Sequence, residues 1–328
     1  MIKLAYLAVL GAVVGTLLLG LLPAGASLLP SLLFWVALVQ GAVALAAAGE
    51  LTRARWILPL RPVLLGLHPL LLIFPFAFLV FSMRISVYPW TEHPNAWLSP
   101  GFFITRNVLL LLLTWALGTL YARADGSARS GKLAVLYVLA FVVTQSIIAF
   151  DWVMSFEYPW ISTLLGGYFF VESLYVGIAL AGLLAAWRVR RRGDGSRVTL
   201  RDAATLLFGF SLLWAGQFFA QYLVIWYGNI PEEAAFLVRR LSASPLRQMS
   251  SMVLGCLFFV PFLVLLSRRT KSSPGAVTVA AVVVGAGVLV ERLVLLWPVM
   301  PLNFLVVAGE FVLLAAACAV PLRRQALV

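Results

Sequence analysis

Residues 28–49 read LLPSLLFWVALVQGAVALAAAG, a run without Asp, Glu, Lys, Arg or His. A helix needs roughly 20 mostly apolar residues to cross the hydrocarbon core of a bilayer, and this run is long enough. Further runs of similar length and composition follow, separated by short segments rich in proline, glycine and charged residues. The ten predicted spans cover residues 4–22, 28–49, 60–82, 101–122, 132–154, 161–187, 203–227, 246–267, 275–296 and 302–321.

The composition also indicates an integral membrane protein. Of the 328 residues, 63% are hydrophobic and 11% are charged, which is about half the charged share of a soluble domain. The formal net charge is +12, but the basic residues form short clusters between apolar runs, a pattern typical of membrane topology and not of nucleic-acid binding. We therefore expect an all-α polytopic membrane protein with a single integral membrane domain, residues 1–328, surrounded by lipid.

The positions of the basic residues indicate the orientation of the spans. With ten spans, all but six of the 24 Lys and Arg residues fall on one side, and the positive-inside rule assigns that side to the cytoplasm. We therefore expect both termini to be cytoplasmic. The six basic residues at or toward the outer face are Arg84, Arg106, Arg239, Arg240, Arg247 and Arg292.

The N-terminal run has an alternative interpretation. Lys3, the apolar stretch after it and Ala24-Gly25-Ala26 resemble a signal peptide with its cleavage site. The stretch is long for a signal peptide, and its retention keeps the basic clusters on one side. We therefore interpret it as a retained first span.

Two segments between spans are predicted on the outer side. Residues 231–244 (PEEAAFLVRRLSAS) are too polar to cross a membrane and fit a short amphipathic helix on its outer surface. Residues 84–100 (RISVYPWTEHPNAWLSP) are rich in proline and aromatic residues, which predicts packing against the membrane face or a partner.

The sequence lacks the patterns that hold redox cofactors. Cys256 and Cys318 lie in apolar runs, and there is no CxxC, CxxCH or Cys/His cluster, which argues against a disulfide framework, c-type haem, zinc and iron–sulfur clusters. Haem b between two helices needs two intramembrane histidines, but only His68 lies in a span, since His93 is in the outer loop. We expect no metal and no covalent cofactor, so the chain would not be catalytic alone.

Ionic and amide side chains are predicted near the outer ends of several spans. A charge within hydrocarbon costs at least ~2.5–3.5 kcal/mol, so each such residue is a candidate for function. Together they would surround a quinone headgroup, with Asp151 as a proton acceptor. The alternative is that Arg106 only neutralises Asp151 and that nearby aromatic residues mark the membrane interface. The candidate quinone-binding residues are Arg106, Asp151, Gln221, Tyr222 and Glu291.

Three ionisable residues are predicted deeper in the membrane. Buried carboxyl groups and histidine are the usual members of a proton relay, and they also serve as hydrogen-bonded contacts between helices. Pro62, Pro69 and Pro75 predict a kink or an unwound turn in the span that includes one of them. The candidate proton-path residues are His68, Glu172 and Glu310.

Two segments resemble a known family. Residues 149–167 read AFDWVMSFEYPWISTLLGG, and residues 218–233 read FFAQYLVIWYGNIPEE. They are similar to signature segments of the NrfD-like, or polysulfide-reductase-type, membrane subunits, and most similar to the second large membrane subunit of alternative complex III, a bacterial quinol:cytochrome c oxidoreductase. The resemblance covers roughly residues 50–300. The positions that match family motifs are Arg106, Asp151, Gln221, Tyr222, Asn229, Glu232 and Glu233.

The resemblance implies a place in a larger respiratory complex of the bacterial inner membrane. It implies two four-helix bundles, here residues 28–154 and 161–296, with two further helices. It also implies a sister NrfD-like subunit, an iron–sulfur subunit and c-type cytochromes as partners. A quinone or menaquinone pocket and a proton path are implied for this subunit type.

The chain departs from the family pattern at one informative place. Where the family usually has an acid, Pro, His and Trp, this sequence has Glu157, Tyr158, Pro159 and Trp160, so the histidine is missing. A quinol site that depends on that histidine is therefore in doubt. The alternatives are a structural scaffold subunit and, from another class, a secondary transporter, which duplicated bundles and a proline-broken helix also fit.

Overall fold

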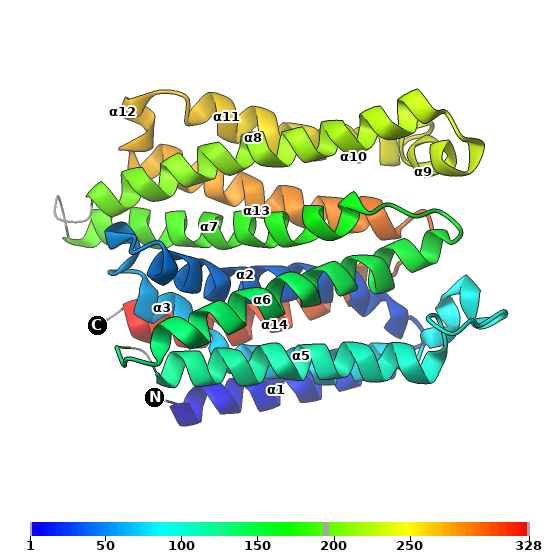
Figure 1. Cartoon of the computed structure of the whole chain (residues 1–328), viewed down its shortest axis with the longest axis horizontal. Coiled ribbons are helices and arrows are strands. Elements are labelled where there is room, and N and C mark those ends of the chain that lie inside the picture. Colours follow the sequence, from blue (N-terminus) through cyan, green and yellow to red (C-terminus); the bar gives the residue numbers. More distant parts are fainter. Residues whose placement is uncertain (1, 125, 193–196, 327–328) are drawn as a thin grey trace.

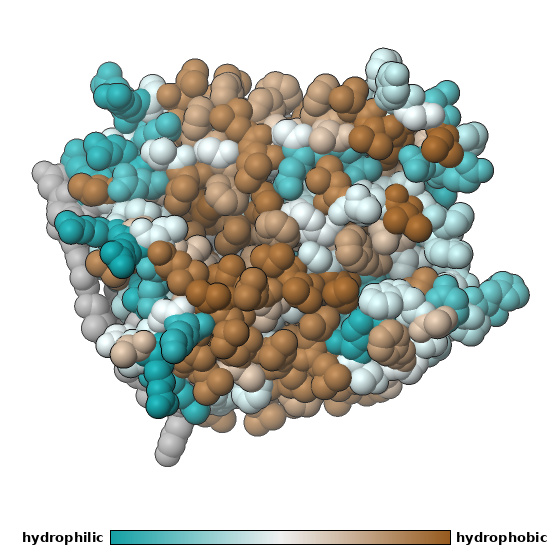
Figure 2. Space-filling view, in the orientation of Figure 1, coloured by the Kyte–Doolittle hydropathy of each residue, from teal (hydrophilic) through white to brown (hydrophobic). Residues whose placement is uncertain are grey.

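The chain forms a bundle of roughly parallel and antiparallel helices (Figure 1). The computed structural model describes residues 2–124, 126–192 and 197–326, and their regular elements are all helical. Nine helices within these ranges are long and apolar enough to cross a membrane, and the apolar part described for the first helix, Tyr6–Gly20, is shorter. An apolar surface band lies between two hydrophilic ends (Figure 2). The chain is therefore a multi-pass membrane protein.

Each predicted span coincides with helical structure. Most differ from the prediction by a few residues at the ends, the usual uncertainty of helix boundaries. The long elements are α1 (Ile2–Gly20), α2 (Leu29–Leu51), α5 (Pro100–Arg123), α6 (Ser130–Ile148), α7 (Leu164–Arg192), α8 (Arg197–Gly228), α13 (Pro274–Leu296) and α14 (Phe304–Ala326). Two predicted spans are broken into shorter elements. The third consists of α3 (Arg61–Leu65), η3 (His68–Leu72) and α4 (Ile73–Ser82), and the eighth consists of α10 (Leu246–Leu254), η9 (Gly255–Phe259) and α11 (Val260–Val264).

Helices α2 and α7 form the centre of the molecule. Nearly all of α2 and most of α7 are buried, whereas α8 and α10 are exposed along most of their length. The two central helices touch at glycines: a Cβ on Gly41 would lie 1.8 Å from the carbonyl oxygen of Ser173, and one on Gly177 would lie 2.7 Å from the Gly41 carbonyl carbon. Small residues permit such close backbone contact between membrane helices.

The other helices pack on either side of this central pair. On one side α6 contacts α2 and α5, and α4 contacts α5; on the other, α8 and α13 contact α7, and α10 contacts α13. Helices α1 and α14 pack against each other, with α14 also against α2. The first turn of α1 and the last turn of α14 lie at the same end of the molecule (Figure 1). We call the opposite end the outer end.

The predicted break in the third span is present. Residues 61–82 form a short α-helix, a 3-10 segment and a second α-helix, with Pro62 and Pro69 in the first turns of the first two. Proline lacks an N–H and clashes with the preceding turn, which interrupts regular α-helix.

Helix α9 (Pro231–Leu241) lies at the outer end, where residues 231–244 predict an amphipathic helix (Figure 1). Its acidic residues, Glu232 and Glu233, are in the first turn, and its basic residues, Arg239 and Arg240, are in the last. This order matches the helix dipole at both ends.

Candidate functional site

The first outer polar cluster joins α5 to the end of α6. Asp151 lies in η6 (Ala149–Val153), a π-helical turn that continues α6, and its side chain is fully buried. Arg106 donates to both carboxylate oxygens at 2.9 Å, and Asn107 Nδ2 donates to Oδ2 at 2.6 Å. The ion pair between Arg106 and Asp151 is therefore present, and it is bidentate, which is the strongest geometry for such a pair.

Aromatic rings fill the space around this cluster. Trp152 donates from Nε1 to Asn107 at 2.8 Å and stacks on Phe78 at 4.8 Å between ring centroids. Tyr88, from the outer loop, stacks on Phe156 at 4.0 Å and donates to the Trp152 carbonyl at 3.3 Å. Burial, with a smaller effect of the Asp151 charge, raises the pKa of Tyr88, which therefore stays protonated. This region is a packed core.

The second outer polar cluster joins α7 to α13. Tyr168 and Glu172 are one turn apart on α7, and they bond to adjacent residues of α13: Tyr168 donates to Glu291, and Arg292 donates to Glu172. Arg292 is fully buried, its guanidinium carbon 4.2 Å from the Phe169 ring centroid. Glu291 Oε2 is 3.8 Å from Arg292 Nη1 and accepts no hydrogen bond from the described residues. Two carboxyl groups thus share one guanidinium.

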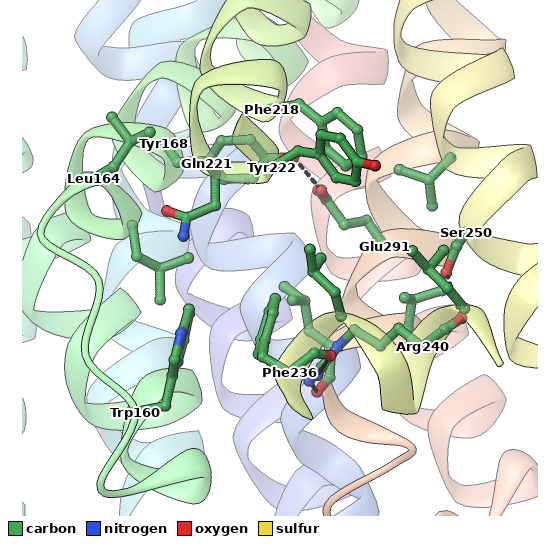
Figure 3. A pocket seen from close by; sticks show the side chains of 16 residues that line it. Trp160, Leu164, Tyr168, Phe218, Gln221, Tyr222, Phe236, Arg240, Ser250 and Glu291 are labelled. Atoms are coloured by element: carbon green, nitrogen blue, oxygen red, sulfur yellow. Dashed lines mark hydrogen bonds between the residues drawn. The ribbon is translucent and has the colours of Figure 1, made fainter. Parts of the chain in front are cut away.

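A cavity of about 110 Å³ opens beside this second cluster (Figure 3). Glu291 is the acidic residue in its wall, and Gln221 and Tyr222 of α8 also face it. Ser162 donates to Gln221 Oε1 at 2.5 Å, which leaves the amide nitrogen of Gln221 for a ligand. Apolar side chains make up most of the rest of the wall, which is usual for small-molecule sites. They include Trp160, Leu165, Phe218, Leu237, Val253 and Leu295.

Helix α9 covers the outer side of the cavity (Figure 3). Phe236 stacks on Trp160 at 4.1 Å, and Arg240 is almost completely buried. Arg240 donates to Glu157 Oε1, to the Leu295 carbonyl and to the Phe236 carbonyl, each at 2.8 Å. Burial lowers the pKa of Arg240, and the Glu157 charge opposes that shift. These contacts hold α9 against α13 and the segment after α6.

The structure divides the single outer ring expected from the sequence into two clusters. Gln221, Tyr222 and Glu291 line the cavity, whereas neither Arg106 nor Asp151 does. Depth along each helix predicts that these groups lie at one level, but it does not give the order of helices around the bundle.

The candidate proton-path residues belong to different contacts. His68 Nδ1 is 2.9 Å from the Leu65 carbonyl in the broken third span, and Glu310 of α14 accepts from Thr16 of α1 at 2.8 Å. Of the three, only Glu172 lies near the cavity: it accepts a hydrogen bond from Arg292, whose neighbour in the chain, Glu291, lines the cavity. Among the residues that the structure describes, no hydrogen bond connects these three side chains to one another.

Several cavity residues were not among the sequence candidates. The sequence alone gives no functional role to Tyr168, Trp160, Phe236 or Arg240. A signal was present for Arg240, because an arginine on the apolar side of an amphipathic helix requires an acidic partner. Nothing local in the sequence identifies Glu157 as that partner.

Comparison with known proteins adds no identification. No protein-family model matches this chain, and no curated protein is similar to it. The geometry of the cavity and its polar cluster therefore carries the functional argument.

Proposed function

We propose that this chain is a membrane subunit of a bacterial respiratory quinol oxidoreductase complex, and that its cavity binds a quinone headgroup. In this proposal the chain has ten spans with both termini in the cytoplasm. The sequence resemblance implies a sister NrfD-like subunit as a membrane neighbour, and an iron–sulfur subunit and c-type cytochromes that would accept the electrons. The chain itself would contribute the pocket and a group that accepts a proton.

One observation carries the proposal: a mostly apolar cavity contains a carboxyl group that has no counter-ion of its own. Glu291 shares Arg292 with Glu172, so the cluster holds an extra negative charge unless one carboxyl group takes up a proton. Gln221 offers an amide nitrogen on another wall of the cavity. Such a pair suits a headgroup with one hydroxyl donor and one carbonyl or hydroxyl acceptor.

The proposed chemistry assigns the proton acceptor to Glu291 in place of Asp151. A quinol hydroxyl would donate its proton to the Glu291 carboxylate while its electron passes to the redox centre of a partner subunit. Asp151 is a poor acceptor, because Arg106 and Asn107 already occupy both of its oxygens. Tyr168 would orient Glu291 through its hydroxyl group.

A substitution that fills the cavity tests the proposal. In Val253→Trp a bulky ring enters the cavity from α10, where Val253 is 4% exposed. Labelling by a photoreactive short-tailed naphthoquinone should fall at least tenfold, which is about 1.4 kcal/mol of binding. Val135→Trp, on the exposed face of α6, is the matched control and should label as the wild type does. Equal labelling of all three proteins would contradict the proposal.

A scaffold role is the second candidate, favoured by the complete pairing of Asp151 and by the dense aromatic packing around it. In that case the protein would co-purify with haem and iron–sulfur absorbance but would not label with the quinone. A secondary transporter would instead give a colourless preparation that takes up solute in vesicles.

A further inference from the structure

A second pocket lies at the other end of the molecule, where α2 ends and α3 begins. It has a volume of about 240 Å³, and its wall includes Arg53, Arg61 and Glu50 together with the apolar residues Ile57 and Leu58. By the predicted orientation this is the cytoplasmic boundary of the membrane. The pocket is separate from the quinone cavity and shares no lining residue with it.

The backbone at Arg53 is unusual for an arginine. Its φ angle is +54°, in the left-handed region that favours glycine. Arg53 N donates to the Glu50 carbonyl at 3.0 Å, and Ala54 N donates to the Gly49 carbonyl at 2.8 Å, which is the Schellman motif that ends a helix, normally with glycine in this position. Glycine would fit this turn with less strain, which makes the arginine side chain a candidate for a role outside the fold.

The charges of the pocket favour an anion. Glu50 Oε2 accepts from Arg61, from Tyr121 at 2.7 Å and from Ser130 at 2.9 Å, so its charge is already compensated. Arg61 and Glu50 form an ion pair, and Arg53 adds a positive charge to the pocket wall beyond that pair. The backbone N–H groups of Arg53 and Ala54 and the hydroxyl of Thr52 donate to carbonyl groups at the end of α2. These carbonyl groups therefore do not require the arginine side chain.

The apolar side of the pocket favours a lipid over a free ion. Leu58 is 57% exposed and Leu51 is 42% exposed beside the arginine. Exposed leucines next to an arginine at a membrane boundary match the junction of a lipid headgroup and its acyl chains. We propose that this pocket binds the phosphate of an anionic phospholipid in the cytoplasmic leaflet.

Native mass spectrometry of the full chain tests this proposal. The protein is released from bilayers of equal phosphatidylglycerol and phosphatidylethanolamine, and retained lipid is counted. The wild type should retain phosphatidylglycerol preferentially, and Arg53→Gly, which keeps the left-handed turn, should lower that retention roughly fivefold, the effect of one arginine at a charged membrane surface.

The control is Arg123→Ala, which removes an exposed arginine from the last turn of α5. It changes net charge and helix dipole in the same way, and its lipid retention should equal that of the wild type. Equal retention by wild type and Arg53→Gly would overturn the proposal. So would an equal loss in Arg123→Ala, or displacement of the lipid by millimolar inorganic phosphate, since the site would then take a free anion.

Discussion

The two outer polar clusters both hold a buried carboxyl group, but they neutralise its charge to different extents. Each places a carboxyl group and an arginine toward the outer end of the helix bundle. Asp151 has Arg106 to itself, whereas Glu291 shares Arg292 with Glu172. Stacked aromatic rings fill the space next to Asp151, and an open cavity lies next to Glu291.

Under the proposed function, this difference separates a structural ion pair from a group that exchanges protons. A buried charge is stable when its partner and its hydrogen bonds are complete, and all of those are present at Asp151. An acid that lacks a full partner and faces a cavity can exchange a proton with a ligand. A charged residue deep in the membrane therefore needs a partner of opposite charge. Whether all of its hydrogen bonds and its counter-ion are present then decides whether it is free to exchange a proton with a ligand.

Removal of Asp151 should have the largest effect on stability. Asp151→Ala leaves the Arg106 guanidinium without its partner, and breaking a buried pair in this way costs about 3–5 kcal/mol. Thermal or denaturant unfolding of the purified protein measures the change. The double variant Arg106→Ala/Asp151→Ala should be less destabilised than the single one, because no unpaired charge remains. A single variant as stable as the wild type would show that the aromatic packing alone holds this region.

Substitutions in the contact between α9 and the rest of the bundle should have an intermediate effect on stability. They test which residues hold α9 over the cavity. Arg240→Ala removes three hydrogen bonds from a buried guanidinium and should weaken the local attachment of α9 by about 2 kcal/mol, as for hydrogen bonds of charged groups. Arg239→Ala is the neighbouring control: that side chain is 49% exposed and also pairs with Glu157, so its loss costs about 0–1 kcal/mol.

Hydrogen exchange of residues 231–241 measures both variants. Exchange should quicken strongly in Arg240→Ala and little in Arg239→Ala. Equal exchange in the two variants would mean that the Phe236–Trp160 stack, and not the buried arginine, holds α9 in place.

The sequence predicted the helices well because their signal is local. Runs such as residues 28–49 are apolar over the length of a span, and Pro62 and Pro69 mark the break in the third span. The surface helix α9 was also predicted, since PEEAAFLVRRLSAS combines polar ends with an apolar face. The number of membrane crossings and the side on which the termini lie stay predictions.

The candidate site was predicted only in part, because proximity between helices is not a local property. Gln221, Tyr222 and Glu291 were grouped by depth and do line one cavity. Asp151 was grouped with them by the same rule, but its helix places it against Arg106 instead. The sequence predicted Arg292 toward the outer face and Glu172 deeper in the membrane, and only the packing of α13 on α7 shows that they form one ion pair.

The smallest change, Glu291→Gln, decides whether the second cluster differs from the first in function. The amide oxygen of glutamine can still accept from Tyr168, and the variant removes a charge that has no full partner, so stability should change by less than about 1 kcal/mol.

Binding of a short-tailed quinol should nevertheless weaken at least tenfold, about 1.4 kcal/mol, because the proton acceptor in the cavity is lost. Glu310→Gln is the matched control: that residue is also buried, accepts a hydrogen bond from Thr16 and lies outside the cavity. Calorimetric or fluorescence titration of both variants, with any co-purifying subunits present, gives the affinities. If Glu291→Gln binds quinol as tightly as Glu310→Gln does, the shared guanidinium is only a weaker ion pair, and the two clusters are alike in function.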